Sequence, residues 1–148
     1  MSDADPKKTL ITYRIASALE KLKSAVDLLE KEDYKDSVSR SYYAIFTAAR
    51  ALLATRQLDS AKHSGVIALF NQHFVKNGIV PKETSKLIEK AKLYREQADY
   101  GDFFIVSKEE AEAQIESAKR FIDNVKSGIE KTERMDDSTY TESKNKNS

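Results

Sequence analysis

An arginine, an aspartate and a tyrosine stand close together where one predicted helix ends. Arg95, Asp99 and Tyr100 belong to the stretch YREQADYG, which closes with a glycine. An aspartate is unfavourable there, because the C-terminal end of a helix dipole is itself negative. An ion pair from Arg95 to Asp99, four residues later, contributes only a few tenths of a kcal/mol in this order. We therefore expect Asp99 to face a positive group outside its helix, and the ion pair within the helix is the alternative.

Basic residues also gather along the helix that carries Arg95. Side chains of this kind contact phosphate groups, although a charged surface face explains them equally well. The members are Lys82, Lys86, Lys90, Lys92 and Arg95.

His63 is the strongest candidate for proton chemistry. It lies beside Lys62 in the first turn of a predicted helix, where positive neighbours favour the neutral imidazole. A neutral histidine can act as a base or as a hydrogen-bond partner; the alternative is an exposed histidine near a helix start. His73 follows ten residues later, which is the wrong spacing for a helical metal pair, and the chain has no cysteine. The sequence therefore predicts no metal site and no cofactor.

A second polar stripe runs along the helix expected at residues 34–55. Arg40, Tyr43, Thr47 and Arg50 recur at spacings of three, four and three, on the side opposite the apolar stripe that contains Tyr42. This pattern fits either a solvated helix face or a second contact surface for a subunit or a ligand, where Arg and Tyr are favoured. We predict a cleft with Arg40 and Tyr43 on one side and Arg95, Asp99 and Tyr100 on the other. The Asp99 partners that we expect are Arg40, Arg50 or a positive group of a partner molecule.

Apolar residues repeat every three to four positions along most of the chain, which indicates amphipathic helices. In the first helix the apolar stripe comprises Leu10, Tyr13, Ala16, Leu19, Leu22, Val26 and Leu29. Asp33 is expected to cap the second helix, and Ser107 with Glu110 forms a capping box for the fifth. The five expected helices span residues 8–31, 34–55, 60–77, 81–101 and 107–131. The fold class is therefore all-α, an up-and-down antiparallel bundle of about five helices.

Composition sets the domain organisation and limits the partners. The 148 residues carry 25 basic and 24 acidic side chains, a net charge of +1, so a site for nucleic acid must be local rather than global. We expect one domain over residues 1–131 and a disordered polar tail over residues 132–148, which lack helical periodicity. No apolar run approaches the roughly 20 residues that span a bilayer, and the polar start is unlike a secretory signal. We therefore expect a cytoplasmic protein without a membrane partner.

Three blocks of the sequence resemble the HEPN domain (higher eukaryotes and prokaryotes nucleotide-binding) in its small stand-alone prokaryotic form. The resemblance covers roughly residues 8–130. It implies an up-and-down helical bundle, usually a homodimer, often encoded beside a minimal nucleotidyltransferase as a toxin–antitoxin-like pair. The blocks are SRSYYAIFTAARALL (39–53), AKHSGVIALFNQHFVKNG (61–78) and YREQADYG (94–101).

Active members of this family are metal-independent ribonucleases with an arginine followed after four to six residues by a histidine. Arg95 falls at the matching place, but residues 100–102 are Tyr, Gly and Asp. Arg56 and His63 have the required spacing only across the link between two helices. RNA cleavage needs a proton acceptor that works near neutral pH, and tyrosine, with a pKa near 10, does not supply one. Arg95 can still bind a phosphate through two hydrogen bonds, and Tyr100 can stack on a base or accept a modification.

Three hypotheses follow from the residues and the resemblance. The first is a nucleotide- or RNA-binding module, dimeric, that pairs with a nucleotidyltransferase through the toxin–antitoxin arrangement. The second is a degenerate ribonuclease that uses Arg95 with His63 or Tyr100. The third is a structural dimeric protein whose polar stripe is a subunit interface. The residues assigned to the cleft are Arg40, Tyr43, Arg50, His63, Arg95, Asp99 and Tyr100.

Overall fold

The chain is an all-α bundle, as predicted. The computed structural model describes residues 5–146, with side chains as far as Asp137, and this part of the chain contains no strand. Its elements are α1 (Pro6–Glu30), α2 (Tyr34–Ala54), α3 (His63–Phe70), the π-helix η1 (Asn71–Val75), α4 (Glu83–Tyr100) and α5 (Lys108–Lys146).

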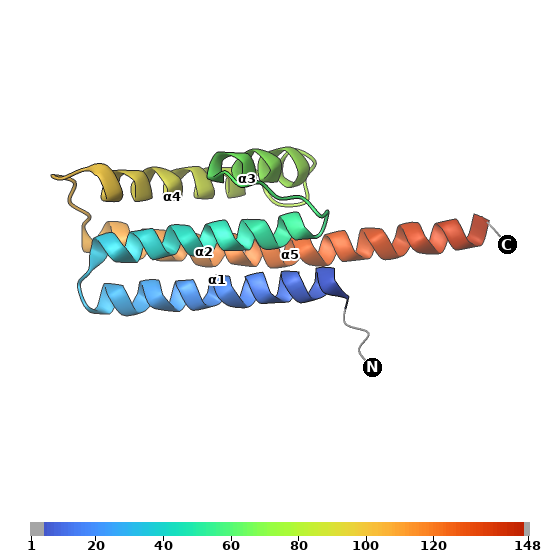
Figure 1. Cartoon of the computed structure of the whole chain (residues 1–148), viewed down its shortest axis with the longest axis horizontal. Helices are drawn as coiled ribbons and strands as arrows, with labels where there is room; N and C mark the ends of the chain where they lie inside the picture. The colour runs from blue at the N-terminus through green and yellow to red at the C-terminus, as the bar shows by residue number, and fades with distance from the viewer. Residues whose placement is uncertain (1–4, 147–148) are drawn as a thin grey trace.

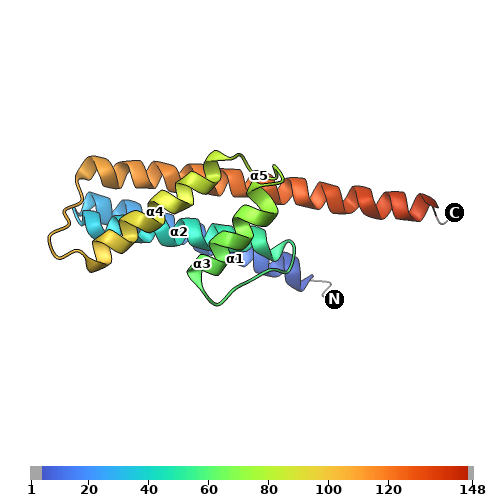
Figure 2. The ribbon, with the colours of Figure 1, turned by 90° about the horizontal axis from the view of Figure 1, so that it is seen from above.

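The helices lie in three layers around α2 (Figure 1). The first layer is α1, the middle layer is α2 with α5, and α3 and α4 cover the other side. Seen from above, α4 crosses over α2, and the link from α4 to α5 lies at the same end as the turn between α1 and α2 (Figure 2). This arrangement places α4, which carries Arg95, directly against α2, which carries Tyr43.

Side-chain caps mark the starts of α1, α2 and α5, and Asp5 caps α1 by accepting from Lys7 N–H at 3.0 Å. Asp33 Oδ1 accepts a hydrogen bond from the backbone N–H of Asp36 at 3.3 Å. Ser107 Oγ accepts from Glu110 N–H, and the Glu110 carboxylate accepts from Ser107 N–H, both at 3.1 Å. These bonds satisfy backbone donors that have no partner inside the helix. Both predicted caps are confirmed.

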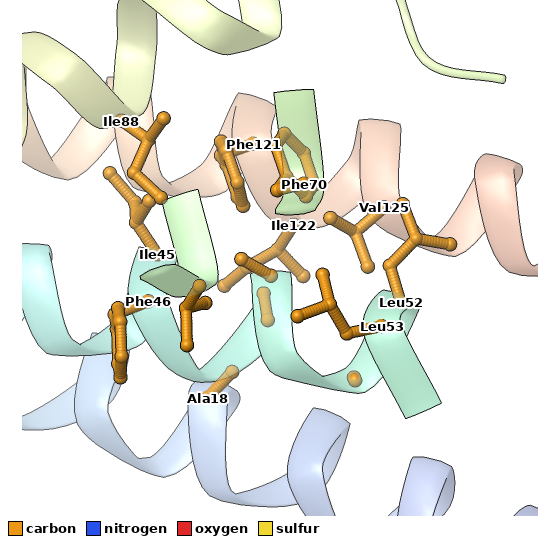
Figure 3. Packing of buried hydrophobic residues seen from close by; sticks show 14 of the residues in the cluster. Ala18, Ile45, Phe46, Leu52, Leu53, Phe70, Ile88, Phe121, Ile122 and Val125 are labelled. Carbon is orange, nitrogen blue, oxygen red and sulfur yellow. The ribbon is translucent and has the colours of Figure 1, made fainter. Parts of the chain in front are cut away.

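The core surrounds α2, which is buried along most of its length. Figure 3 shows Leu52 and Ile45 of α2 packed with Phe121 and Ile122 of α5 and with Phe70 of α3. Towards α1, α2 instead presents small side chains, and Ser37 Oγ donates to the backbone carbonyl of Ala25 at 2.8 Å. Small residues let two helix backbones approach closely. The buried small residues of α2 are Ser37, Ser41, Ala44, Ala48, Ala49, Ala51 and Ala54.

The predicted apolar stripe of the first helix is wrong in part. Leu10, Tyr13 and Leu19 are exposed, whereas the buried positions of α1 are spaced by seven residues. The physical reason is the close α1–α2 contact, which takes alanine in preference to the larger side chains. The buried residues of α1 are Ile11, Ala18 and Ala25.

The last helix continues past Lys131. Thr132 is buried and its hydroxyl donates to the Gly128 carbonyl at 2.9 Å, while Asp136 pairs with Arg56 at 3.0 Å. The division into a bundle and a disordered tail over 132–148 stays a prediction, and its last two residues lie outside the described range. Among the described residues, no helix is both long enough and apolar enough to cross a membrane.

Candidate functional site

Arg95 is held between two helices. Its Nη2 donates a hydrogen bond to the hydroxyl of Tyr43 on α2 at 2.9 Å. Its Nε lies 3.0 Å from Asp99 Oδ2, one turn further along α4, in an ion pair whose angle falls outside that of a hydrogen bond. The guanidinium carbon also lies 5.4 Å from the centre of the Tyr43 ring and 5.7 Å from that of Tyr42. Nη2 is thereby fixed by a hydrogen bond, whereas Nε is a buried donor that has an ion pair but no hydrogen-bond partner among the described residues.

His63 lies on the same pair of tyrosines. Its Nδ1 shares a 3.0 Å hydrogen bond with the hydroxyl of the buried Tyr42, and its ring stacks on Phe46 with 4.1 Å between centres. The Tyr43 ring meets the His63 ring edge-on at 6.2 Å. The start of α3 and the middle of α4 therefore converge on Tyr42 and Tyr43, which bring Arg95 and His63 to one place.

Burial and three positive charges shift the pKa of His63. Burial is the main cause that lowers the pKa of His63 below its ordinary 6.5, and the positive charges of Arg95, Lys92 and Arg50 lower it further. A lowered pKa favours the neutral form that we predicted, and its causes are burial and these three residues rather than Lys62. Burial also raises the pKa of Tyr42 to about 12, so this hydroxyl stays protonated.

An open pocket of about 360 Å³ adjoins the Arg95 site on α2. Arg40, Tyr43, Ser39 and Asp36 line it together with Leu28 of α1. The side chain of Asp33 is the main cause that raises the pKa of Asp36, with burial and the charge of Asp99 in the same direction and Arg40 opposing. Tyr43 is common to the pocket and to Arg95. The pocket therefore offers one cation, one hydroxyl-bearing ring, a hydroxymethyl group and the carboxyl group of Asp36 beside a positioned guanidinium.

Arg50 lies in a different cluster from Arg95. It donates hydrogen bonds of 2.8 and 3.2 Å to the carboxylate of Asp59, in the link between α2 and α3. The hydrogen bonding and the positive charge of Arg50 lower the pKa of Asp59. Arg14 of α1 donates to the backbone carbonyl of Arg50 at 2.9 Å and lies 3.5 Å from Asp59. This cluster holds the link against the bundle, so the role of Arg50 is structural. Its positive charge also lowers the pKa of His63.

The structure thus brings together some of the residues that we assigned to the cleft. Tyr43, His63, Arg95 and Asp99 lie around one point, and Arg40 lines the adjoining pocket. The expectation that Asp99 pairs outside its helix is not met among the described residues, because its ion pair is with Arg95. The polar stripe of α2 is divided: α4 and α3 cover Tyr43, whereas Arg40 is exposed. Tyr100 is the last residue of α4 and is exposed.

Tyr42 and Phe46 contribute to the site, although the sequence pattern placed Tyr42 in the core. Tyr42 is fully buried and yet bonds to His63. A buried tyrosine usually hydrogen-bonds to a polar partner. A tyrosine among the aliphatic residues of a buried stripe could therefore have indicated from the sequence that Tyr42 takes part in a polar site. The structure also shows no group of three His, Cys, Asp or Glu side chains able to hold a metal ion among the residues that it describes.

The environment of His63 predicts a pH-dependent stability. Because its pKa is lowered in the folded state, the unfolded chain binds a proton first as the pH falls below about 6.5. As the pH falls from 6.5 to the lower pKa of folded His63, the free energy of unfolding should therefore decrease. Above pH 6.5 the full contribution of His63 to stability is retained. Urea unfolding of wild type and His63→Gln at a series of pH values measures this. A wild-type profile parallel to that of His63→Gln would contradict it.

The comparisons with known proteins agree with this bundle. The HEPN domain family model matches residues 11–128. "Putative toxin MJ0605" of Methanocaldococcus jannaschii is 40% identical over 115 residues, which cover 78% of this chain and 85% of that protein. A "UPF0332 protein" of Thermotoga maritima is 38% identical over 128 residues, covering 86% and 97%. "Putative toxin MJ0142", also of Methanocaldococcus jannaschii, is 35% identical over 112 residues, covering 76% of each chain.

The family model spans α2, α3 and α4 completely, and these are the helices that supply Tyr43, His63 and Arg95. The relatives from both organisms likewise match over three quarters or more of this chain. The chain therefore belongs to the HEPN domain family.

Proposed function

We propose that this HEPN domain is a cytoplasmic nucleotide- or RNA-binding module that holds a phosphate group at Arg95. The observation that carries the proposal is the way Arg95 is fixed. Tyr43 and Asp99 orient its guanidinium, and its Nε has no hydrogen-bond partner among the described residues. A guanidinium positioned in advance loses little side-chain entropy when it binds an oxyanion.

The surroundings of Arg95 suit the other parts of a nucleotide. Arg40 supplies a second cation at the pocket, and the Tyr43 hydroxyl and Ser39 supply polar contacts. The exposed ring of Tyr100, one residue after Asp99, is available for stacking on a base. Phosphate contacts of this kind make affinity depend on salt.

The partner belongs to the same proposal. Two of the relatives carry toxin in their names. We propose that this chain is the toxin-type component of a toxin–antitoxin-like pair in a prokaryote, with a minimal nucleotidyltransferase as the other component. The gene next to this one is the first observation to make, because a nucleotidyltransferase there supports the pairing.

Titration of the wild-type protein with a short single-stranded RNA and with a mononucleotide tests the proposed ligand. At low salt we expect saturable binding, with an affinity that falls as salt is added. If neither probe binds at low salt, the recognition function is wrong and the structural role as an interaction protein is favoured.

A homodimer is the expected assembly, with the Arg95 pockets of two subunits facing one shared cleft. Sedimentation equilibrium at micromolar concentration measures the mass directly, and twice the chain mass of 16.8 kDa is the expected value. A monomer at that concentration would remove the shared-cleft part of the proposal.

Ribonuclease activity is the second candidate, and the position of His63 is what favours it. His63, whose pKa is lowered, lies against Tyr42 and Tyr43, and the Arg95 guanidinium lies over the same two rings. We nevertheless expect metal-free RNA cleavage to be absent or weak, because no histidine follows Arg95 at the family position. A positioned acid–base group typically contributes about 10²–10⁴-fold to a rate.

A cleavage assay without metal on wild type, His63→Ala and Arg95→Ala separates these candidates. No cleavage by any of the three leaves a binding module. Robust cleavage by the wild type, abolished by either substitution, would overturn the expectation and assign His63 as the base.

A further inference from the structure

The link between α4 and α5 presents two large apolar side chains to solvent. Phe103 is 95% exposed and Ile105 is 83% exposed, whereas their neighbours point the other way. Phe104 packs near Tyr94, with 6.4 Å between ring centres, and Val106 is buried in the small cluster at this end of the bundle. The alternation anchors the link through residues 104 and 106 and turns residues 103 and 105 outward.

The turn before this link is tightly built. Gly101 N–H donates to the Gln97 carbonyl at 2.9 Å, and Phe104 N–H donates to the Gly101 carbonyl at 3.0 Å. A Cβ on Gly101 would lie 2.8 Å from the Gln97 carbonyl oxygen and 2.9 Å from Phe104 Cβ, too close for any larger residue without a shift. The turn therefore supports the outward direction of Phe103 and Ile105, and both side chains stay exposed in the part of the chain that the structure describes.

The surroundings of these two side chains are acidic. The turn between α1 and α2 lies at the same end of the bundle (Figures 1 and 2). Residues 30–36 and 102–110 together carry seven acidic and three basic side chains, a net charge of −4 in a chain whose net charge is +1. Asp99 is not included, because it is paired with Arg95. The other exposed acids nearest the link in sequence are Asp102 and Glu109, and the turn adds Glu30, Glu32 and Asp36.

We propose that Phe103 and Ile105, within this acidic rim, dock a different protein that offers an apolar pocket bordered by lysine or arginine. Large exposed apolar side chains with a polar rim are typical of protein interfaces, where buried aromatic residues supply much of the affinity. Nucleic acid fits this surface poorly, because Asp102 and Glu109, the exposed acids beside Phe103 and Ile105 in the sequence, repel phosphate. A second copy of this chain does not fit either, since two-fold pairing at this end would oppose two acidic rims.

Site-specific crosslinking in the native cell finds the occupant. The full chain carries Phe103→p-benzoylphenylalanine, and the matched control is Tyr13→p-benzoylphenylalanine on α1, an aromatic residue that is 69% exposed. We expect one protein of a different sequence to crosslink at position 103 and not at position 13. No crosslink at position 103, or crosslinks only to RNA or to a second copy of this chain, would overturn the proposal.

Binding of the purified crosslinked protein to the purified chain supplies the second half of the test. Phe103→Ser should raise the Kd about ten-fold or more, because a buried aromatic anchor is lost, while Tyr13→Ser leaves it unchanged. Glu30→Gln combined with Asp102→Asn should weaken binding and make it less dependent on salt. An unchanged Kd for Phe103→Ser would show that the captured protein does not use this surface. Arg95 is not altered in these variants, so the outcome is independent of the phosphate proposal.

Discussion

Arg95→Ala is expected to weaken binding of a short RNA or a mononucleotide by about ten-fold to a hundred-fold at low salt. Hydrogen bonds to a charged group contribute about 1.5–3 kcal/mol, which corresponds to this range of affinity. The variant also leaves Asp99 without its cation beside the ligand, which adds repulsion against a phosphate. For RNA, the slope of log affinity against log salt should fall by about 1, because one phosphate contact is lost.

Two further substitutions show whether the effect belongs to this site. Arg95→Lys keeps the charge but not the planar fork, so it should restore only part of the affinity. Arg120→Ala removes an exposed arginine from α5 and should have little effect. Equal losses for Arg95→Ala and Arg120→Ala would mean that binding is a diffuse charge effect, and an unchanged affinity for Arg95→Ala would place the ligand elsewhere.

Phe70→Ala is expected to lower the free energy of unfolding by about 3–5 kcal/mol, the usual cost of truncating a buried phenylalanine. Phe70 is fully buried between Phe74 and Phe121, with ring centres at 6.3 and 5.3 Å, so the neighbours can close little of the cavity. Phe103→Ala is the matched control, because the same atoms are removed from a side chain that is 95% exposed. Urea unfolding should show a change near zero for the control. Similar losses for both would contradict the assignment of the core.

Local chemistry explains why most of the fold was predictable. Asp33 and the Ser107–Glu110 box satisfy backbone donors that any helix start exposes, so they mark the starts of α2 and α5 from sequence alone. The buried face of α1 was less predictable. Leu10 and Leu19 fit an apolar stripe, but which side of the helix is buried depends on the small residues of α2, a property of the pair of helices.

In the site, too, some features were predictable from the sequence and others depend on how the helices pack. Arg95 and Tyr43 were assigned to one cleft from residue type and position, and they share a hydrogen bond across 52 residues of sequence. The observed partner of Asp99 is the alternative that the sequence offered, the ion pair with Arg95 within the helix. The weak pair on an isolated helix did not favour it, and the sequence did not show that Tyr43 would also hold Arg95. The approach of His63 to the same tyrosines depends on how the link after α2 folds back, which Arg50 and Arg14 fix through Asp59.

The most direct measurement of the central claim is an NMR titration of the Arg95 side chain. The Nε–H resonances of the arginines are followed while adenosine 5′-monophosphate or a short single-stranded RNA is added at low salt. We expect the Arg95 resonance to shift and saturate together with the backbone signals of Arg40 and Tyr43, with Arg120 unmoved. Saturable binding that leaves Arg95 unshifted, or no binding of either probe, would contradict a phosphate site at Arg95.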